Sequence, residues 1–360
     1  MKYYTLDSIL KYNADYNIIY GERSNGKTTA VLKYALLDYI NSGYCNQLAV
    51  VRRWEEDFKG KNGQQMYEGI VSLGWIKDFT KGKYNAVYYY SQRWYLCLYD
   101  ENGNKKAQDD RPFALGFSIT SEEHYKSTAY PDIKTILFDE FITRGYYLPE
   151  EFVKFQNLLS TIIRLRNDVK IFMCGNTINK YCPYFAEMGL RNIRTQKKGS
   201  IDIYTYGESD LIVAVEYSDF SGKKKESNKY FAFDNPKLEM ITQGGWEIDI
   251  YPHLPHKYAP KDVLYKFYII FDGDILQGNI ISIDDTVFLY MHRKTTPIKE
   301  DNTQIVYHSQ PNYKRNYRTN FLKPYGKVDK FIKMLYDRQK IFYQDNEVGE
   351  IMNNYIKSCV

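Results

Sequence analysis

The stretch that decides the fold runs from Gly21 to Thr28 and reads GERSNGKT. It fits the pattern G-x-x-x-x-G-K-[ST] without a departure. Tyr16–Tyr20 before it has the composition of a short buried strand, and Thr29–Leu37 after it has the apolar spacing of a helix. A glycine loop between a strand and a helix cradles phosphate, because backbone N–H groups and the positive helix end face the anion. The stretch therefore predicts a nucleotide-binding loop, and the alternative is an ordinary Gly/Asn connection.

The positions within this loop have different expected parts. Lys27 would reach the β- and γ-phosphates of ATP, and the Thr28 hydroxyl would hold Mg²⁺. The other residues expected to contact the nucleotide are Gly21, Ser24, Asn25, Gly26 and Thr29. ATP and Mg²⁺ are thus the expected cofactors.

A second stretch, Thr135–Glu140, reads as a buried strand that ends in two carboxylates. Parallel α/β sheets bind ligands at the carboxyl ends of their strands, so both acids are expected beside the phosphate loop. Asp139 is placed to hold Mg²⁺ in the manner of a Walker B aspartate, and Glu140 to polarise an attacking water. Acid pairs at strand ends are common, so this pair indicates a functional site only in combination with the complete phosphate loop upstream. Together the two stretches predict hydrolysis rather than binding alone.

Two further buried strands, Gln47–Val51 and Val169–Cys174, are expected to complete a parallel sheet. Arg52 and Arg53 follow the first of them; they lie near the phosphates, on a ring-facing edge, or merely cap a loop. Asn176 follows the second, either as a sensor of the γ-phosphate or lytic water or as a residue that shapes the turn. The fold class is α/β, with a P-loop NTPase domain.

Between these strands the pattern changes twice. Tyr84–Thr120 favours strands with tight turns and carries a hairpin signal at Asp100–Gly103, so it is a β insertion or an antiparallel extension of the sheet. Pro149–Arg166 is expected to be a helix with one apolar face.

Composition limits the class of protein. The chain has 360 residues, 26% charged and 44% hydrophobic, which fits a globular protein of two or three units. It has no apolar run of membrane-span length, and its beginning lacks the apolar core of a signal peptide. Five scattered cysteines without metal-type spacing are typical of reduced thiols in an intracellular protein. A net charge of +5 permits a nucleic-acid partner without demonstrating one.

The predicted domains are a P-loop ATPase domain at 1–200, a linker or intermediate module at 201–258, and a smaller α+β C-terminal domain at 259–360. A meander of strands is expected between Lys266 and Tyr290. Cations interleaved with tyrosines follow: Lys314, Arg315, Arg318, Lys323, Lys327, Lys330 and Lys333. They form either a patch for the phosphate backbone of nucleic acid or a solvated basic helix face.

Several motifs, in the same order along the chain, resemble the packaging ATPases of small protein-primed podophages. They are Val50–Trp54, Lys126–Pro131, Thr135–Ile142, Arg164–Asn167 and Asn176–Phe185. The resemblance implies an ATPase of the additional-strand, catalytic-glutamate (ASCE) class that forms a homomeric ring, pentameric in the family. Such a ring sits in the host cytoplasm, attaches transiently to the portal of a prohead and drives double-stranded DNA inside. The resemblance also allows an RNA scaffold as a partner, and we expect no membrane partner.

The resemblance also implies roles for single residues. Arg164 resembles an arginine finger that reaches the γ-phosphate of a neighbouring subunit, and Lys126 a second cation at that interface. A cation supplied across an interface stabilises transition-state charge only when the subunits are aligned. Read without the resemblance, Arg164 is an ordinary helix-end cation. Arg23 could stabilise charge in cis, and Glu55 stands where the family has a lysine, so no role is transferred there.

The family's C-terminal domain resembles an RNase H-like nuclease that has lost its catalytic carboxylates and kept a nucleic-acid-binding role. Four acids, Asp272, Asp274, Asp284 and Asp285, could in principle hold a metal, but acid pairs in turns are more often solvated, so we expect no nuclease activity. Two alternatives stay open: a terminase-like ATPase with an active nuclease half, and a nucleotide-switched assembly protein with little turnover. Glu140 argues against the second.

Overall fold

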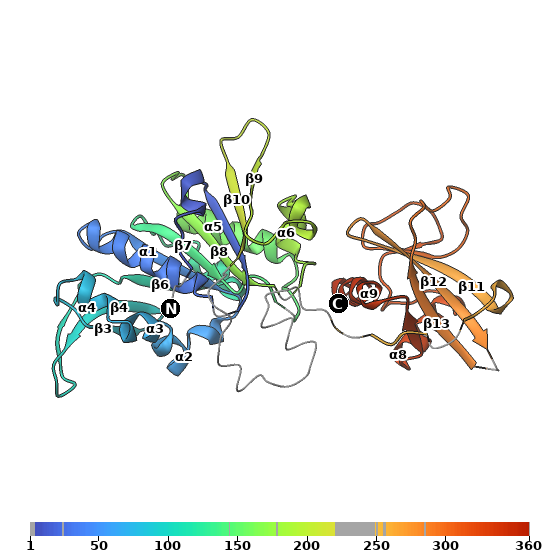
Figure 1. Cartoon of the computed structure of the whole chain (residues 1–360), viewed down its shortest axis with the longest axis horizontal. Coiled ribbons are helices and arrows are strands. Elements are labelled where there is room, and N and C mark those ends of the chain that lie inside the picture. Colours follow the sequence, from blue (N-terminus) through green and yellow to red (C-terminus); the bar gives the residue numbers. More distant parts are fainter. Residues whose placement is uncertain are drawn as a thin grey trace. The chain divides into compact units, whose positions relative to one another are not determined.

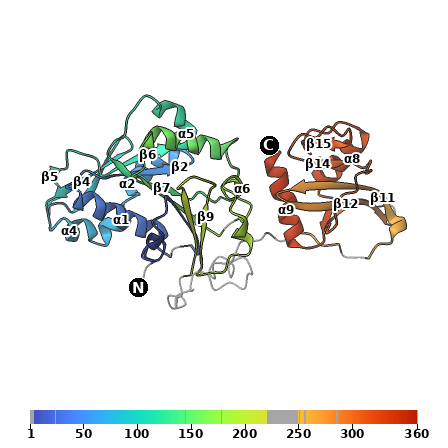
Figure 2. The same ribbon diagram turned by 90° about the horizontal axis from the view of Figure 1, so that it is seen from above.

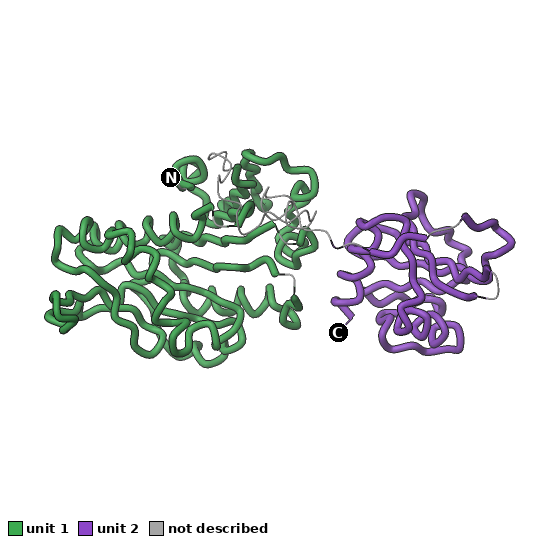
Figure 3. The backbone as a smooth tube through the Cα atoms, turned by 60° about the horizontal axis from the view of Figure 1, so that its bottom comes forward, with its two compact units in different colours: residues 1–246 green, residues 247–360 purple. Residues whose placement is uncertain are grey.

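The computed structural model describes residues 4–23, 25–143, 145–177, 179–219, 249, 251–254, 257–283 and 286–359. The chain divides into two compact units, residues 1–246 and 247–360, and each is described by itself (Figure 3). Within the described ranges, the helices are all too short or too polar to cross a membrane.

The first unit is built on one large sheet with a parallel centre (Figure 1). Its strands are β1 (Tyr16–Gly21), β2 (Gln47–Arg52), β3 (Ala86–Tyr90), β4 (Arg93–Tyr99), β5 (Lys105–Gln108), β6 (Ala114–Ser118), β7 (Ile133–Asp139), β8 (Lys170–Asn176), β9 (Ile201–Thr205) and β10 (Ile212–Ser218). Their order is β3-β4-β6-β2-β7-β8-β1-β10-β9, and β5 pairs with β4. The strands from β6 to β10 in this order pair in parallel, whereas β3, β4 and β9 are antiparallel edges. The predicted mixed α/β fold with a parallel sheet is confirmed.

Helices cover both faces of this sheet. They are α1 (Lys27–Asn41), α2 (Gly60–Gln65), α3 (Glu68–Ser72), α4 (Trp75–Phe79), α5 (Glu151–Ile163) and α6 (Pro183–Glu187). Neighbouring strand residues belong to opposite layers of the core: Ile18 packs with α5 and α6, and Ile19 packs with α1, α3 and α4. Both layers are apolar because successive side chains of a strand point to opposite faces, and here both faces are covered.

Two strands of the sheet lie beyond the predicted end of the first domain. The sequence places that end at residue 200, but β9 and β10 belong to the sheet, and β10 pairs in parallel with β1. The compact unit accordingly extends to residue 246 instead of giving way to a separate module at 201–258. Within that predicted module, the basic segment Gly222–Lys225 and the Gly244–Gly245 pair lie outside the described residues.

The β-rich segment before β7 forms an antiparallel extension of the sheet through β3, β4 and β5. The turn at Asp100–Asn104 joins β4 to the short β5, and the Asp100 carboxylate accepts backbone hydrogen bonds from Asn102 and Asn104 at 3.0 and 2.8 Å. The next strand, β6, pairs in parallel with β2 and so belongs to the centre of the sheet.

The second unit is a smaller sheet with helices (Figure 2). Its elements are β11 (Val263–Phe271), β12 (Asp274–Ile283), β13 (Thr286–Arg293), β14 (Val306–His308), β15 (Tyr317–Arg318), α8 (Lys327–Asp337), β16 (Ile341–Tyr343) and α9 (Asn346–Ser358). The strand order is β15-β14-β11-β12-β13-β16. The meander β11–β12–β13 is antiparallel, as predicted, while β14 and β15 continue from β11 in parallel.

Candidate active site

The glycine loop is tied to the strands on both sides of β1. Gly21 has φ +152°, and a Cβ there would lie 2.2 Å from Ser218 Oγ on β10, so only glycine fits. The Thr177 N–H after β8 donates to the Gly21 carbonyl at 3.1 Å, and Asn25 Nδ2 donates to Ser218 Oγ at 3.0 Å. Gly26, at φ +93°, turns the chain into α1. Ser24 lies outside the described residues.

Lys27, the first residue of α1, points back into this loop. Its ammonium donates to the Glu22 carbonyl at 2.5 Å, to Asn25 Oδ1 at 3.2 Å and to Asn176 Oδ1 at 3.4 Å. Burial lowers the pKa of Lys27 to about 8, which Asp139 and Glu22 partly oppose. The contact with Asn176 brings the end of β8 to the loop, and the role of that amide as a sensor stays a prediction.

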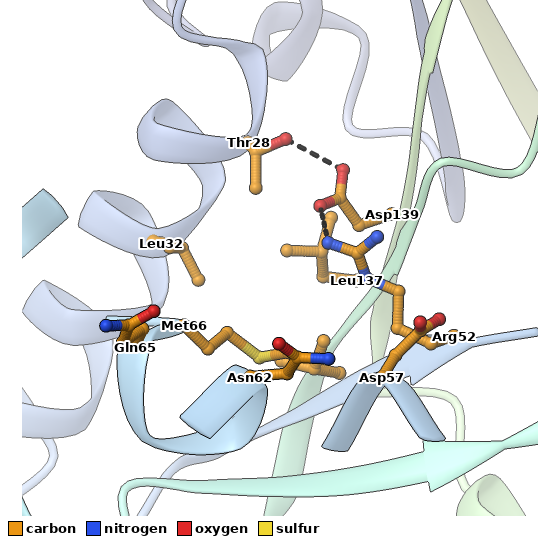
Figure 4. A pocket seen from close by; sticks show the side chains of 10 residues that line it. Thr28, Leu32, Arg52, Asp57, Asn62, Gln65, Met66, Leu137 and Asp139 are labelled. Atoms are coloured by element: carbon orange, nitrogen blue, oxygen red, sulfur yellow. Dashed lines mark hydrogen bonds and ion pairs between the residues drawn. The ribbon is translucent and has the colours of Figure 1, made fainter. Parts of the chain in front are cut away.

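The acidic strand β7 ends directly opposite the loop. Thr28 Oγ1 donates to Asp139 Oδ1 at 2.7 Å (Figure 4). Burial raises the pKa of Asp139, and the nearby Arg52 guanidinium opposes that rise. Glu140 follows with a left-handed backbone, φ +59°, and an exposed side chain. Strained backbone of this kind in a residue other than glycine is characteristic of functional sites.

Arg52 and Arg53, the two arginines after β2, have different partners. Arg52 bridges the acidic pair, with Nη2 2.8 Å from Asp139 Oδ2 and Nη1 2.7 Å from Glu140 Oε2. Arg53 is buried and pairs through two nitrogens with Glu151, at 2.8 Å each. The Tyr184 hydroxyl also donates to Glu151, at 2.9 Å. Arg52 therefore faces the site, and Arg53 ties the start of α5 to the end of β2.

These groups surround two adjoining cavities. The main cavity, of about 580 Å³, is lined by Arg23, the loop from Asn25 to Thr29, the segment from Arg52 to Trp54, the acidic pair and Asn176. Its size is in the range of small-molecule sites. The second, of about 350 Å³, shares Thr28, Arg52, Asp57 and Asp139 with the first (Figure 4). We call it the side recess; Leu32, Val50, Met66 and Leu137 form its apolar part, and Asn62 and Gln65 add amides.

The donor set between α1 and β7 suits magnesium. The Thr28 hydroxyl and the Asp139 carboxylate are hard oxygen donors in direct contact. Mg²⁺ is usually held by one or two carboxylates together with waters and substrate phosphates, rather than by an all-protein cage. Among the described residues, no group of three or more His, Cys, Asp or Glu could hold a metal ion.

Lys126 and Arg164, the residues expected to act across an interface, lie together on an exposed face. Arg164 follows the last residue of α5 with φ +54°, and its Nη2 donates to the Thr128 carbonyl at 3.2 Å. Lys126 pairs with Glu123 at 2.5 Å, and Leu165 next to Arg164 is fully exposed. Lys126 and Arg164 are absent from the described lining of both cavities. We call Lys126, Thr128, Arg164 and Leu165 the α5 end face.

The predicted basic patch of the second unit is partly neutralised. Arg318 pairs with the buried Asp329 at 3.2 Å, and Lys333 pairs with Asp337 at 2.5 Å. The cations of the set that remain exposed are Arg315, Lys323, Lys327 and Lys330, and Tyr313 and Tyr325 are exposed beside them. Of the four acids weighed for a metal, Asp274 pairs with Arg293 at 3.2 Å, while Asp284 and Asp285 lie outside the described residues.

Fold and site together define the class: a mixed α/β protein whose glycine loop and acidic pair meet in a cavity at the carboxyl edge of a parallel sheet. The family model of the podovirus DNA encapsidation protein (Gp16) matches residues 103–233. The DNA packaging proteins of Bacillus phages PZA and phi29 are each 25% identical over 329 residues, covering 88% of this chain and 88% of theirs. The resemblance expected from the motifs is thereby confirmed: the chain is similar to the podovirus DNA encapsidation protein over residues 103–233 and to these DNA packaging proteins over most of its length.

A solved structure agrees at the level of the fold. The chain resembles that in the bacteriophage phi29 viral genome packaging motor assembly, with a TM-score of 0.57 and 18% identity over 99% of both chains. The fold of this chain is therefore similar to that of a chain in this motor assembly.

Proposed function

We propose that this chain is an ATP-hydrolysing translocase that packages double-stranded viral DNA into a prohead as a homomeric ring. Its relatives are named for DNA packaging, which supports the process. The observation that carries the chemistry is the Thr28–Asp139 hydrogen bond, which joins the phosphate loop to the acidic strand with Glu140 next in line.

The strand order supports the finer class of the ATPase. β8 lies between β1, which carries the glycine loop, and β7, which carries the acids. Two features define the ASCE class of P-loop ATPases: an additional strand at this place, and a glutamate directly after the aspartate that binds the metal. The nucleotide would lie in the main cavity, with its phosphates against the loop N–H groups and Lys27.

In the proposed mechanism, the residues around the main cavity have separate roles. Thr28 and Asp139 would hold Mg²⁺, which neutralises charge on the β- and γ-phosphates. Glu140 orients the attacking water and accepts its proton, for which its carboxylate has to be free of Arg52. Asn176 is placed to contact the γ-phosphate, and Arg23 lines the same cavity as a cation in cis.

The α5 end face supports a ring. Its two cations lie on an exposed surface of the subunit, where a neighbour can meet them. In a homomeric ring the same face would bring Arg164 and Lys126 to the cavity of the next subunit, and hydrolysis would require correct alignment. A pentamer bound to a portal, with or without an RNA scaffold, fits this proposal.

The second unit supports a nucleic-acid-binding role without cleavage. In RNase H-like sheets, three antiparallel strands are continued by two strands that run parallel to the first. The order β15-β14-β11-β12-β13 has this arrangement. The exposed cations near α8 would contact the phosphate backbone of DNA. DNA cleavage by the purified chain with Mg²⁺ or Mn²⁺ would favour the terminase-like alternative instead.

The test of the proposed function is Glu140→Gln in the full chain. We expect DNA-stimulated ATP hydrolysis to fall by about 100-fold or more, because the water loses its general base. Nucleotide affinity should stay within about threefold, since the amide keeps the volume of the side chain. Unchanged turnover would contradict a catalytic glutamate and favour the nucleotide-switched assembly protein.

A further inference from the structure

Asn25 is buried in the glycine loop, and its contacts fix the direction of its side chain. It is only 4% exposed. Its amide oxygen accepts hydrogen bonds from the Lys27 backbone N–H at 3.3 Å and from the Lys27 ammonium at 3.2 Å. Both of these groups can only donate, so the amide nitrogen of Asn25 has to point the other way. That nitrogen donates to Ser218 Oγ on β10 at 3.0 Å.

Ser218 continues this contact to the strand that precedes the loop. Its hydroxyl accepts from Asn25 and donates its own proton to the Tyr20 carbonyl at 3.0 Å. Ser218 is fully buried at the end of β10, where it lies opposite Gly21 in the parallel pair with β1. A buried polar group that loses its partner is costly. The Asn25 amide is therefore held in place as long as the Ser218 hydroxyl is present.

The backbone of Asn25 is also attached to β10, through Tyr4. The Tyr4 N–H donates to the Asn25 carbonyl at 3.1 Å, and the Tyr4 hydroxyl donates to the Glu216 carboxylate at 2.6 Å. Tyr4 and Glu216 are both buried. Glu216 and Ser218 are two residues apart in one strand, so their side chains point to the same face. One face of β10 thus holds the side chain of Asn25 directly and its carbonyl indirectly.

The residues that follow Asn25 explain why this attachment matters. Gly26 has φ +93°, a conformation that glycine adopts easily but does not maintain by itself. Lys27 begins α1, and the N–H groups of the loop and of the helix start form the proposed phosphate cradle. Their direction depends on how the residue before Gly26 is held. A cradle that already has its binding conformation avoids the cost of being ordered when the ligand binds.

We propose that Ser218 is a positioning residue for the nucleotide. It holds Asn25, and the Tyr4–Glu216 contact provides a second attachment, so that the phosphate cradle has its binding conformation before the nucleotide arrives. This inference rests on the proposed function, because it assigns the phosphates to the glycine loop. It adds to the nucleotide site a strand, β10, that contains none of the site residues predicted from the sequence.

The experiment titrates N-methylanthraniloyl ADP with Mg²⁺ into the full-length chain and measures the dissociation constant. For Ser218→Ala we expect this constant to rise by about tenfold, because the cradle has to be ordered on binding. A fall in the constant would instead mean that the Asn25 oxygen competes with phosphate for Lys27, and it would overturn the proposal.

Ser118→Ala is the matched control. Ser118 is also fully buried and also ends a strand of the same sheet, β6. Its Oγ has no hydrogen-bond partner among the described residues. The variant should therefore change the dissociation constant by less than about twofold. Equal effects of Ser118→Ala and Ser218→Ala would show a general response of the sheet and overturn the proposal.

A double variant tests whether Ser218 acts through Asn25. Asn25→Ala should also raise the dissociation constant by about tenfold, and Ser218→Ala should add nothing in the Asn25→Ala background, because the side chain that it holds is gone. Additive effects of the two substitutions would mean that Ser218 acts by another route, and the proposal would fail.

Steady-state kinetics separate positioning from a structural defect. The cradle would hold the β-phosphate in the ground state and the transition state alike, so Ser218→Ala should raise KM for ATP by about tenfold and change kcat by less than about threefold. A structural defect lowers the amount of active protein, which reduces kcat and leaves KM unchanged; that result would contradict positioning.

Tyr4→Phe decides the matter if Ser218→Ala does not fold. It keeps the backbone N–H that contacts Asn25 and removes only the hydroxyl that ties Tyr4 to Glu216. We expect the dissociation constant to rise by about threefold, less than for Ser218→Ala, because this attachment is indirect. In that case an unchanged constant in Tyr4→Phe would overturn the proposal.

The same titration distinguishes this inference from the proposed function. If the wild-type chain binds the nucleotide and Ser218→Ala binds it equally well, the positioning role is refuted and the proposed ATPase is not. If the wild-type chain does not bind the nucleotide at all, the proposed function is overturned, and the inference falls with it.

Discussion

The carboxyl edge of the first sheet and the α5 end face both present cations, but they hold them differently. At the carboxyl edge, Lys27 and Arg53 are only 5% and 7% exposed, and each is fixed by two or more oxygens of its own chain. On the α5 end face, Lys126 and Arg164 are exposed, with a surface glutamate and a single carbonyl as partners. Exposed pairs of this kind contribute little, so these charges remain available to another molecule.

The difference is the one we expect if, as proposed, the cavity binds its nucleotide with residues of its own chain and the α5 end face acts on a neighbouring subunit. Buried cations are costly unless paired, so Lys27 and Arg53 are each held by oxygens of their own chain. A cation meant for a neighbour's phosphate has to stay solvated until the neighbour arrives. Four experiments test this contrast, in order of decreasing expected effect.

The largest effect is expected at the α5 end face. Arg164→Ala should lower DNA-stimulated ATP hydrolysis by about a thousandfold, because a finger that stabilises transition-state charge is lost. In mixtures with the wild type, activity should fall more than in proportion to the mutant fraction, since each variant subunit disables its neighbour. Arg191→Ala, which removes another exposed cation of the same unit, is the control and should leave the rate unchanged. A strictly linear loss in mixtures would show that Arg164 is only a helix-end cation.

The next effect is on stability and concerns the buried pair. Glu151→Gln leaves Arg53 charged, buried and unpaired, which should cost about 3–5 kcal/mol in the free energy of unfolding. Glu123→Gln breaks the exposed pair with Lys126 and should cost less than about 1 kcal/mol. Urea unfolding of the full chain, followed by fluorescence, measures both. Equal losses for the two variants would remove the contrast between the two regions.

A third prediction concerns the loop lysine. Lys27→Ala removes the ammonium that would meet the β- and γ-phosphates, and we expect ATP affinity to fall by about 100-fold, measured by titration with a fluorescent nucleotide. Lys126→Ala, tested on the same preparation, should bind ATP as the wild type does. Unchanged affinity in Lys27→Ala would contradict nucleotide binding by this loop.

The smallest effect is the pH dependence of nucleotide affinity. Lys27 has a pKa lowered to about 8 by burial, so above pH 8 the empty chain holds it neutral, and binding has to supply the proton. Affinity should therefore fall by about tenfold between pH 7 and pH 9, a dependence that Lys27→Ala should lack. The same pKa also affects folding. The pKa of Lys27 in the folded chain, about 8, is below its value of 10.5 in the unfolded chain, so the contribution of Lys27 to stability increases as the pH rises through this interval.

Local patterns were enough for the parts of the site that a few consecutive residues define. The glycine loop follows from strand, glycines and helix within one segment, and the acidic pair from one strand end. Glu151 was missed, because a glutamate in the first turn of a helix is ordinary and only its partner Arg53, 98 residues away, makes it buried. The sequence analysis placed β10 outside the ATPase domain, because the residues before it lack the regular apolar spacing of strands and helices that would have linked it to the sheet.

The phosphate loop and the carboxylate strand can be predicted from the sequence, because each depends on spacing within a short segment, and the alternation of strands and helices predicts a parallel sheet. Which arginine faces the site could be learned from the folded chain alone. Arg52 and Arg53 are adjacent, and successive side chains at a strand end point to opposite sides, so one meets β7 and the other α5. Which side is which depends on elements far along the chain, and long-range packing rather than local pattern sets their positions.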